Sequence, residues 1–292
     1  MLTRLRSLLF VPGNRSNMLD KALGFRPDVY VPDMEDSVPV SEKVNARDVV
    51  RRYLPKLNTT GRGVIPRVNA LDTGLTEDDL TAVMGPHIHG VSIGKIQTRD
   101  DIRSICEIMQ GLENNTGLKV GDIKLIPWIE TASAVVHCHE ICTASPRIVG
   151  VAFGAEDFTN DMGIERTEDE TALNFARSTV CVAARAAHVT ALDTPYFEFK
   201  DQDGLARNAL SAKRLGFKGK FAIHPAQVDP LNEAFSPSQA EIDHARRVVA
   251  AFSEAERAGR GSTSLDGIVV DVPVVKRAQA TLQLAESLQG SE

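Results

Sequence analysis

The feature of this sequence that most constrains its fold is a regular alternation of short β-branched or apolar runs with longer segments of helical period. Eight such runs occur: RSLLFVP from Arg6, DVYVPDME from Asp28, RGVIPRVN from Arg62, GVSIGKI from Gly90, KLIPWIE from Lys124, RIVGVAFG from Arg147, VTALDTP from Val189 and KFAIHP from Lys220. Strands that alternate with helices pair in parallel, and eight of them predict a closed (β/α)8 TIM barrel. An open β-sandwich or a doubly wound sheet is the alternative interpretation.

The segments between these runs carry helix signals. Thr76 precedes Asp79 by three residues, and Thr98 precedes Asp101 by the same spacing, which is the pattern of a capping box. In ALNFARSTVCVAARAAH, apolar residues fall on one stripe that can pack on the barrel: Leu173, Ala176, Val180 and Ala183. The helical segments are therefore predicted to cover the outside of the sheet.

The end of the chain is organised differently from the repeating part. Ser236 and Pro237 predict the start of a long helix, which is followed by the apolar segment DGIVVDVP and by a last helix from about Val274. We predict a barrel domain over residues 1–235 and a C-terminal helical extension over residues 236–292 that packs on a neighbouring subunit.

The composition excludes some classes of function. The net charge is −6, there is no basic cluster and 5% of residues are aromatic, which is not the pattern of a nucleic-acid or anionic-membrane binder. No run of about 18 apolar residues predicts a membrane span, and no small-residue cleavage site follows the N-terminal stretch. We expect a cytoplasmic protein whose four cysteines are reduced thiols packed inside.

Polar residues close several of the predicted strands, and in barrel enzymes the active site lies at these ends. Glu130 ends the fifth run and Asp157 follows the sixth, so their carboxylates are expected to rise from neighbouring positions at the same mouth. Two hard oxygen ligands favour Mg²⁺, which would polarise a carbonyl and stabilise an enolate. The alternative is that each acid only caps the next helix.

Two further features suit an anionic substrate. The glycine of FGAED lets successive backbone N–H groups approach a carboxylate closely, and Arg67 has the donor geometry to bind one in a bidentate manner. His224 precedes a proline, and we interpret it as structural in preference to a catalytic base. Neither a nucleotide-binding glycine motif nor a nucleophile elbow occurs in the sequence.

A set of ordered motifs extends over nearly the whole chain: RSLLFVPG, DMEDSV with EKVNAR, PRVNA, WIETASAV, VAFGAEDF, LGFKGKFAIHPAQV and DGIVVDVP. Together they resemble the citrate lyase β-subunit-like branch of the HpcH/HpaI aldolase superfamily. The resemblance implies a Mg²⁺-binding barrel that cleaves or condenses malyl-, citramalyl- or citryl-type thioesters. The products of cleavage would be an acyl thioester such as acetyl-CoA and a 2-oxo acid such as glyoxylate, pyruvate or oxaloacetate.

The resemblance also implies roles for individual residues. Glu130 and Asp157 match the metal ligands of the family, and Arg67 matches an arginine that binds substrate oxygen and takes part in catalysis. The backbone of Gly154, Ala155 and Glu156 matches the segment that grips the carboxylate of the 2-oxo acid.

Five more residues carry expectations from the resemblance. Asp271 matches an aspartate that relatives insert into the neighbouring subunit's active site as an acid/base, which implies a homotrimer or homohexamer. Arg6 and Lys95 match positions that contact the thioester ligand. Glu35 and Asp36 match an acidic strand end that lines the metal site through water.

Departures from the family pattern put the substrate in doubt, because Gly94, Gln97 and Ala134 stand where proline, glutamate and glycine are common. Three other functions are kept as alternatives. A malyl-CoA-type thioesterase would release free malate, and an HpaI-type aldolase would act on free 2-oxo acids without CoA. A non-catalytic subunit of a lyase complex would need neither the carboxylate pair nor Arg67.

Overall fold

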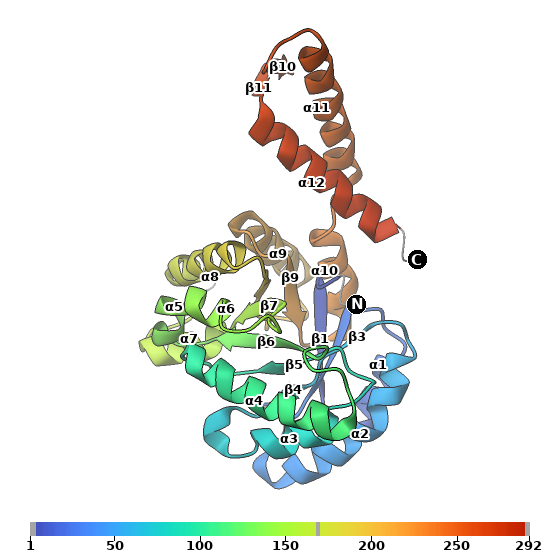
Figure 1. Ribbon diagram of the computed structural model, residues 1–292, viewed down its shortest axis with the longest axis vertical. Coiled ribbons are helices and arrows are strands. Elements are labelled where there is room, and N and C mark those ends of the chain that lie inside the picture. The colour runs from blue at the N-terminus through green and yellow to red at the C-terminus, as the bar shows by residue number, and fades with distance from the viewer. Residues whose placement is uncertain (1–3, 168–169, 290–292) are drawn as a thin grey trace. The chain divides into compact units, whose positions relative to one another are not determined.

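A computed structural model describes residues 4–167 and 170–289 of the chain (Figure 1). The chain divides into two compact units, residues 1–232 and residues 233–292. The division falls at Asn232, close to the boundary at residue 235 that the sequence predicts.

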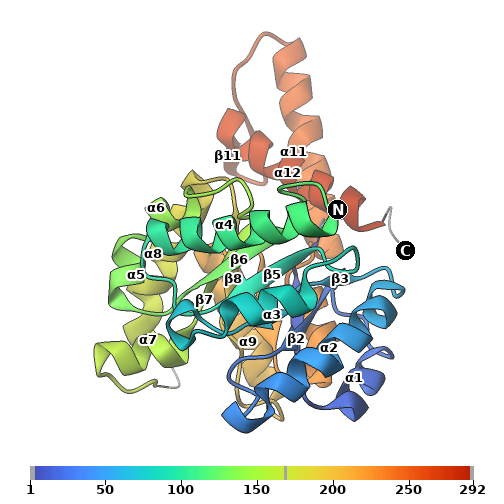
Figure 2. The same cartoon turned by 60° about the horizontal axis from the view of Figure 1, so that its bottom comes forward.

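The first unit is a closed parallel barrel. Its strands are β1 (Ser7–Pro12), β2 (Val29–Asp33), β3 (Gly63–Val64), β4 (Arg67–Val68), β5 (Gly90–Ile93), β6 (Lys124–Ile129), β7 (Gly150–Phe153), β8 (Thr190–Asp193) and β9 (Gly219–Ala222). They pair in parallel, and β1 pairs with both β9 and β2, which closes the sheet. Each predicted run contains a strand, so the TIM barrel is confirmed and the open-sheet alternative is wrong. Figures 1 and 2 show helices arranged around the strands.

The third strand position of the barrel is occupied by two short strands, β3 and β4. β3 and β4 both pair with β2, and Pro66 lies between them and has no N–H to donate to the sheet. The carbonyl of Pro66 still accepts a hydrogen bond from the N–H of Ser92 at 2.8 Å. The interruption places Arg67 opposite Asp33 at the carboxyl end of β2.

The helices of this unit are α1 (Ser16–Ala22), α2 (Lys43–Asn58), α3 (Thr76–Val83), α4 (Arg99–Thr116), α5 (Ala132–Val136), α6 (Cys138–Cys142), α7 (Ala155–Met162), α8 (Asn174–Ala186), α9 (Gln202–Leu215) and α10 (Val228–Ala234). The predicted apolar stripe of α8 is buried, as expected. The helices α4 and α3 differ in how they begin. Thr98 forms the predicted capping box with Asp101, whereas Thr76 lies inside α3 and donates to the carbonyl of Asn69.

The prediction of a capping box at Thr76 was therefore wrong, and a tertiary contact explains it. The carboxylate of Asp79 accepts the backbone N–H of Asn69 at 2.8 Å and the Nε of Arg47 at 2.6 Å. A carboxylate held by these partners does not turn back to the start of its own helix.

The barrel interior is filled by side chains from most of its strands, including Leu8, Val31, Ile126 and Phe221. Fully burying a side chain of this size stabilises the fold by about 1.5–3 kcal/mol. Near the carboxyl ends three aromatic rings meet, with the centroid of Trp128 lying 4.4 Å from that of Phe221 and 5.8 Å from that of Phe10.

The second unit consists of α11 (Gln239–Arg257), a hairpin of β10 (Thr263–Leu265) and β11 (Ile268–Val270), and α12 (Val272–Gln289). Its core is small and includes Phe252, Val270 and Val275. Ser238 forms the capping box of α11, so the start predicted at Ser236 was two residues early. The last helix begins at Val272, two residues before the position predicted.

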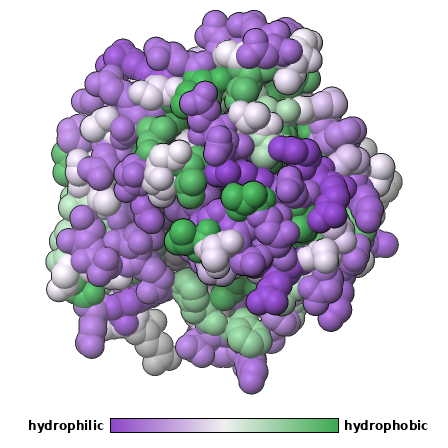
Figure 3. Space-filling model, turned by 90° about the horizontal axis from the view of Figure 1, so that it is seen from below, coloured by the Kyte–Doolittle hydropathy of each residue, from purple (hydrophilic) through white to green (hydrophobic). Residues whose placement is uncertain are grey.

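The cysteines and the exposed apolar side chains of the described residues can be compared with what the composition predicts. Cys138, Cys142 and Cys181 are buried free thiols, as predicted, and Cys106 is half-buried. On the face seen in Figure 3, apolar side chains lie in small groups among hydrophilic ones. No described helix has the length and apolar character needed to cross a membrane.

A buried network of charges fixes the end of β8. Asp193 is fully buried and accepts from Nζ of Lys220 at 2.5 Å and from Nη2 of Arg177 at 2.9 Å. Burial alone would raise the pKa of Asp193, but Lys220 and Arg177 together hold it below its usual value. Each charge is therefore stable in the interior only because its partners are present.

We expect Asp193→Asn to destabilise the barrel by about 3–5 kcal/mol, because Lys220 and Arg177 would lose their shared buried counter-charge. Urea denaturation measures this loss. The matched control is Asp48→Asn, which breaks the exposed pair with Arg51 and should cost less than about 1 kcal/mol. Equal losses in the two variants would contradict the prediction.

Candidate active site

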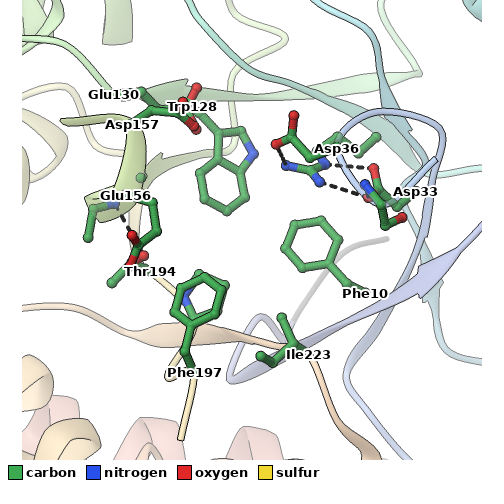
Figure 4. Close-up of a pocket in the computed structure, with 15 residues that line it drawn as sticks. Phe10, Asp33, Asp36, Trp128, Glu130, Glu156, Asp157, Thr194, Phe197 and Ile223 are labelled. Atoms are coloured by element: carbon green, nitrogen blue, oxygen red, sulfur yellow. Dashed lines mark hydrogen bonds and ion pairs between the residues drawn. The ribbon is translucent and has the colours of Figure 1, made fainter. Parts of the chain in front are cut away.

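A cavity of about 310 Å³ lies at the carboxyl ends of the barrel strands. Figure 4 shows its two sides: the carboxylates of Glu130 and Asp157 lie together at one end, and Asp33 and Asp36 flank a guanidinium at the other. Aromatic and apolar side chains, including Phe10, Trp128, Phe197 and Ile223, line the space between them. The structure therefore places Glu130, Asp157 and Arg67 around one cavity, as expected of the mouth of a barrel.

The guanidinium of Arg67 is held by a fork of two hydrogen bonds to Asp33, each 2.7 Å long. Its remaining nitrogen, Nη1, contacts Glu35 at 3.0 Å and Asp36 at 3.2 Å. The guanidinium also lies over the ring of Phe10, 4.5 Å from the centroid. The bidentate partner of Arg67 is thus Asp33, and only Nη1 is directed at the exposed carboxylate of Asp36.

Asp33 closes the second predicted strand, but the sequence alone assigned it no role. It is buried and accepts the backbone N–H groups of Glu35 at 2.9 Å and Ser37 at 3.1 Å, so it fixes the loop after β2. Burial would raise its pKa, yet Arg67 holds the pKa below the usual value. A signal was present in the sequence, because an aspartate closes one predicted strand and an arginine closes the next.

The carboxylate of Glu130 is buried at the end of β6. Its Oε2 accepts the backbone N–H of Lys95 at 2.7 Å. Lys95 has a φ of 58°, in the left-handed region, a conformation that non-glycine residues hold only when the surroundings impose it. Burial raises the pKa of Glu130 to about 8, and the negative charges of Glu35 and Asp157 contribute in the same direction.

Glu35 is a second buried carboxyl group beside the cavity. Its Oε2 lies 3.0 Å from Nη1 of Arg67, and its Oε1 lies 3.7 Å from Nζ of Lys95. Burial raises the pKa of Glu35 to about 7 despite the opposing charge of Arg67. Glu35 therefore lies beside the acidic residues of the cavity, and the contact of Lys95 with a thioester ligand stays a prediction.

The first turn of α7 supplies Asp157 and the predicted carboxylate cradle. The N–H of Gly154 donates to the carbonyl of Ile129 at 3.0 Å, and the N–H of Ala155 donates to Oγ1 of Thr194 at 3.2 Å. These two groups are therefore used within the fold. Among the described residues, the N–H groups of Glu156 and Asp157 remain as the donors at the start of this helix.

The structure does not bring Arg6 to this cavity. Arg6 precedes β1 and therefore lies at the amino end of the barrel, where its Nε and Nη2 bind the carboxylate of Asp28 at 2.9 and 2.7 Å.

Two other residues named from the sequence lie outside the lining of this cavity. Asp271 belongs to the second unit, where its carboxylate accepts the N–H of Val274 at the start of α12. His224 accepts the N–H of Ala226 and caps a short turn, a structural role.

The side chains that could hold a metal ion in the cavity are the two carboxylates of Glu130 and Asp157. Among the described residues, no group of three or more His, Cys, Asp and Glu side chains has the arrangement of a metal site. Magnesium commonly takes only one or two carboxylates and fills its other positions with water and substrate. The pair Glu130 and Asp157 is consistent with that mode of binding.

Comparison with known proteins decides the family. The model of the HpcH/HpaI aldolase/citrate lyase family matches residues 6–225. The chain belongs to this family. The citrate lyase subunit beta of Escherichia coli (strain K12) is 38% identical over 281 residues, which are 96% of this chain and 93% of that protein.

Other members of the family differ in activity or carry ligands. A (3S)-malyl-CoA thioesterase of Cereibacter sphaeroides is 36% identical over 283 residues, covering 97% of this chain and 95% of that protein. A crystal structure of the protein CitE from Mycobacterium tuberculosis, in complex with magnesium, acetoacetate and coenzyme A, is 29% identical. Its TM-score is 0.81, and the match covers 98% of this chain and 100% of that one.

The raised pKa values of Glu130 and Glu35 predict a pH-dependent stability in buffer free of divalent ions. A folded-state pKa of about 7 to 8, above the usual 4.5, means that the folded protein binds more protons than the unfolded chain. This stability is complete below the unfolded pKa and is lost as the pH rises through the folded pKa. We therefore expect the melting temperature to fall as the pH rises from about 5 to about 8 and to level off above that range.

Two variants control this measurement. Glu130→Gln and Glu35→Gln each remove one titrating group, so each should reduce the fall in melting temperature over the same pH range. Asp33 and Asp193, whose pKa values are lowered, affect stability only in the acidic range and do not interfere. An unchanged pH profile in both variants would show that neither carboxyl group is responsible.

Proposed function

We propose that this protein is a magnesium-dependent carbon–carbon lyase. It cleaves or condenses a malyl-CoA, citramalyl-CoA or citryl-type thioester, with an acyl-CoA and a 2-oxo acid on the other side of the reaction. The observation that carries the proposal is the pair of carboxylates, Glu130 and Asp157, at one end of a cavity whose other end holds Arg67. The citrate lyase relative and the magnesium complex of CitE support it.

The charges around the cavity fit a divalent cation. Six carboxyl groups gather there, those of Asp33, Glu35, Asp36, Glu130, Glu156 and Asp157, and the cationic side chains among them are fewer. Burial raises the pKa values of Glu130 and Glu35, and the like charges around each group add to the rise. Glu130 and Asp157 would hold the magnesium ion, which when bound polarises the carbonyl of a 2-oxo acid.

The residues of the chain have separate tasks in this proposal. Nη1 of Arg67 exchanges its contact with the exposed carboxylate of Asp36 for an oxygen of the 2-oxo acid, while the fork to Asp33 keeps the guanidinium in one orientation. The N–H groups of Glu156 and Asp157, at the start of α7, donate to the substrate carboxylate, a charge that the helix N-terminus favours electrostatically. The rings of Phe10 and Trp128 exclude water from one side of the reacting carbons.

Proton transfer is assigned to Asp271 of a neighbouring subunit. The assignment requires an oligomer, and we propose a homotrimer or a homohexamer. Cleavage of the carbon–carbon bond turns the hydroxyl-bearing carbon into the carbonyl of the 2-oxo acid, so the hydroxyl gives up its proton. The enolate left on the acyl thioester gains a proton before it leaves as acyl-CoA. A carboxylic acid that arrives from another subunit can give that proton without competing for the metal.

A thioesterase is the second candidate, and the Cereibacter sphaeroides relative favours it. In that reaction water attacks the thioester carbonyl and the carbon–carbon bond stays intact. Incubation with malyl-CoA separates the two functions, because the lyase releases glyoxylate and acetyl-CoA whereas the thioesterase releases malate and free CoA.

We expect Glu130→Ala and Asp157→Ala each to lower kcat/KM for the cleavage of malyl-CoA or citramalyl-CoA by at least about a thousandfold. Loss of the metal removes several kcal/mol of transition-state stabilisation. Isothermal titration calorimetry should show weakened Mg²⁺ binding in the same variants. The control Glu140→Gln, on the exposed face of α6, should leave both measurements unchanged. Full Mg²⁺-dependent cleavage by either alanine variant would refute the metal assignment.

The role of Asp271 can be tested by mixing subunits. Asp271→Asn and Glu130→Ala are each expected to be inactive alone, the first with normal Mg²⁺ binding. If Asp271 serves a neighbouring subunit, co-expressed mixed oligomers contain intact sites, about a quarter of the total in a cyclic assembly. Activity of the purified mixed oligomer is the measurement. Absence of any recovered activity would place Asp271 in its own subunit's site, and full activity of Asp271→Asn alone would place it outside the reaction.

A further inference from the structure

Helix α7, which carries Asp157, has an N-cap residue with no side chain to accept a hydrogen bond from the first turn. The N-cap position is Gly154, and helix N-caps usually carry a Ser, Thr, Asp or Asn whose oxygen accepts an early N–H of the helix. A Cβ at residue 154 would lie 2.5 Å from Cγ of Glu130, which excludes every side chain at this position. The buried carboxylate of Glu130 therefore prevents α7 from capping itself in the usual way.

The missing acceptor comes from the neighbouring strand. Oγ1 of Thr194 accepts the N–H of Ala155, the first residue of α7, at 3.2 Å, and Figure 4 shows this bond as a dashed line. Thr194 directly follows β8, is 1% exposed and lines the cavity. Its hydroxyl thus does for α7 what an N-cap side chain does in other helices.

The position of Thr194 is itself fixed by buried charge. Its neighbour Asp193 is bound by Lys220 and Arg177, and Arg177 contacts Glu170 at 3.1 Å. Glu170 binds Arg166 at 2.6 Å, and Arg166 binds Glu156 in the first turn of α7. The first turn of α7 is consequently held from two sides, at Ala155 by Thr194 and at Glu156 by Arg166.

We propose that Thr194 is a positioning residue for the metal site, which acts by fixing the first turn of α7 and thereby the carboxylate of Asp157 relative to Glu130. This inference rests on the proposed magnesium site. Asp157 is two residues beyond the N–H that Thr194 holds, so a rotation of this turn moves its carboxylate directly. Thr194 contacts neither Glu130 nor Asp157 through its hydroxyl; it acts through the helix.

The test compares a substitution that removes the Oγ atom of residue 194 with one that keeps it. Thr194→Val keeps the shape of the side chain and removes the acceptor, and Thr194→Ser keeps the acceptor. Mg²⁺ affinity is measured by isothermal titration calorimetry without substrate. We expect Thr194→Val to weaken Mg²⁺ binding by roughly tenfold or more, as loss of an outer-sphere partner commonly does, and Thr194→Ser to stay close to the wild type. Thr179→Val, on α8 with its hydroxyl bonded only to the carbonyl of Phe175, is the matched control.

The variants also separate positioning from simple loss of stability. Melting temperatures are measured first, and titrations are run well below them. If Thr194→Val does not fold, Thr194→Ala and Thr194→Ser form a second pair that differs by one oxygen, and the alanine variant is expected to bind Mg²⁺ more weakly. Equal affinities within the folded pair overturn the inference. A wild-type protein that binds no Mg²⁺ overturns the proposed function instead, and the inference with it.

Discussion

The buried carboxylate of Glu130 determines which residues can stand around it. Its Cγ and Oε1 occupy the space that a side chain at residue 154 would need, and its Oε2 lies 3.1 Å from where a Cβ at Gly94 would be. The N–H that stabilises Oε2 comes from Lys95, whose backbone adopts a left-handed conformation. Three neighbouring strand ends are thus adapted to one acidic side chain. The adaptation has a consequence for α7, which must be capped by Thr194 of another strand.

The two ends of the cavity use charge in opposite ways. Arg67 and Asp33 form a buried pair with two hydrogen bonds, so each charge compensates the other and both are fixed. At the other end burial raises the pKa of Glu130, and the like charges of Glu35 and Asp157 add to the rise. A compensated pair keeps one orientation, whereas carboxylates with raised pKa values favour a nearby cation, which is the role proposed for Glu130 and Asp157. The cavity contains both, and this division is the physical basis of the proposed reaction.

The sequence predicted the elements that depend on local pattern and missed those that depend on tertiary contacts. The eight strands and the buried stripe of α8 follow from β-branched runs and helical period, and the structure confirms them. The start predicted at Thr76 failed because Asp79 is bound by Arg47 and Asn69 from outside its helix. Arg6 is a different case, because it precedes a strand and binds Asp28, and its contact with a thioester ligand stays a prediction. In a parallel barrel that position lies at the amino end, away from the site, and the sequence alone contained this information.

The family relationship leaves two reactions open, and the geometry explains why one scaffold can serve both. Cleavage of a carbon–carbon bond and hydrolysis of a thioester each need an activated carbonyl, so both are compatible with the same carboxylate pair and the same Arg67. They differ in whether water reaches the thioester and in which group moves the proton. Phe10, Trp128 and Phe197 line the cavity with apolar surface and oppose the entry of water. In the proposed reaction this lining therefore favours cleavage of the carbon–carbon bond over attack of water on the thioester.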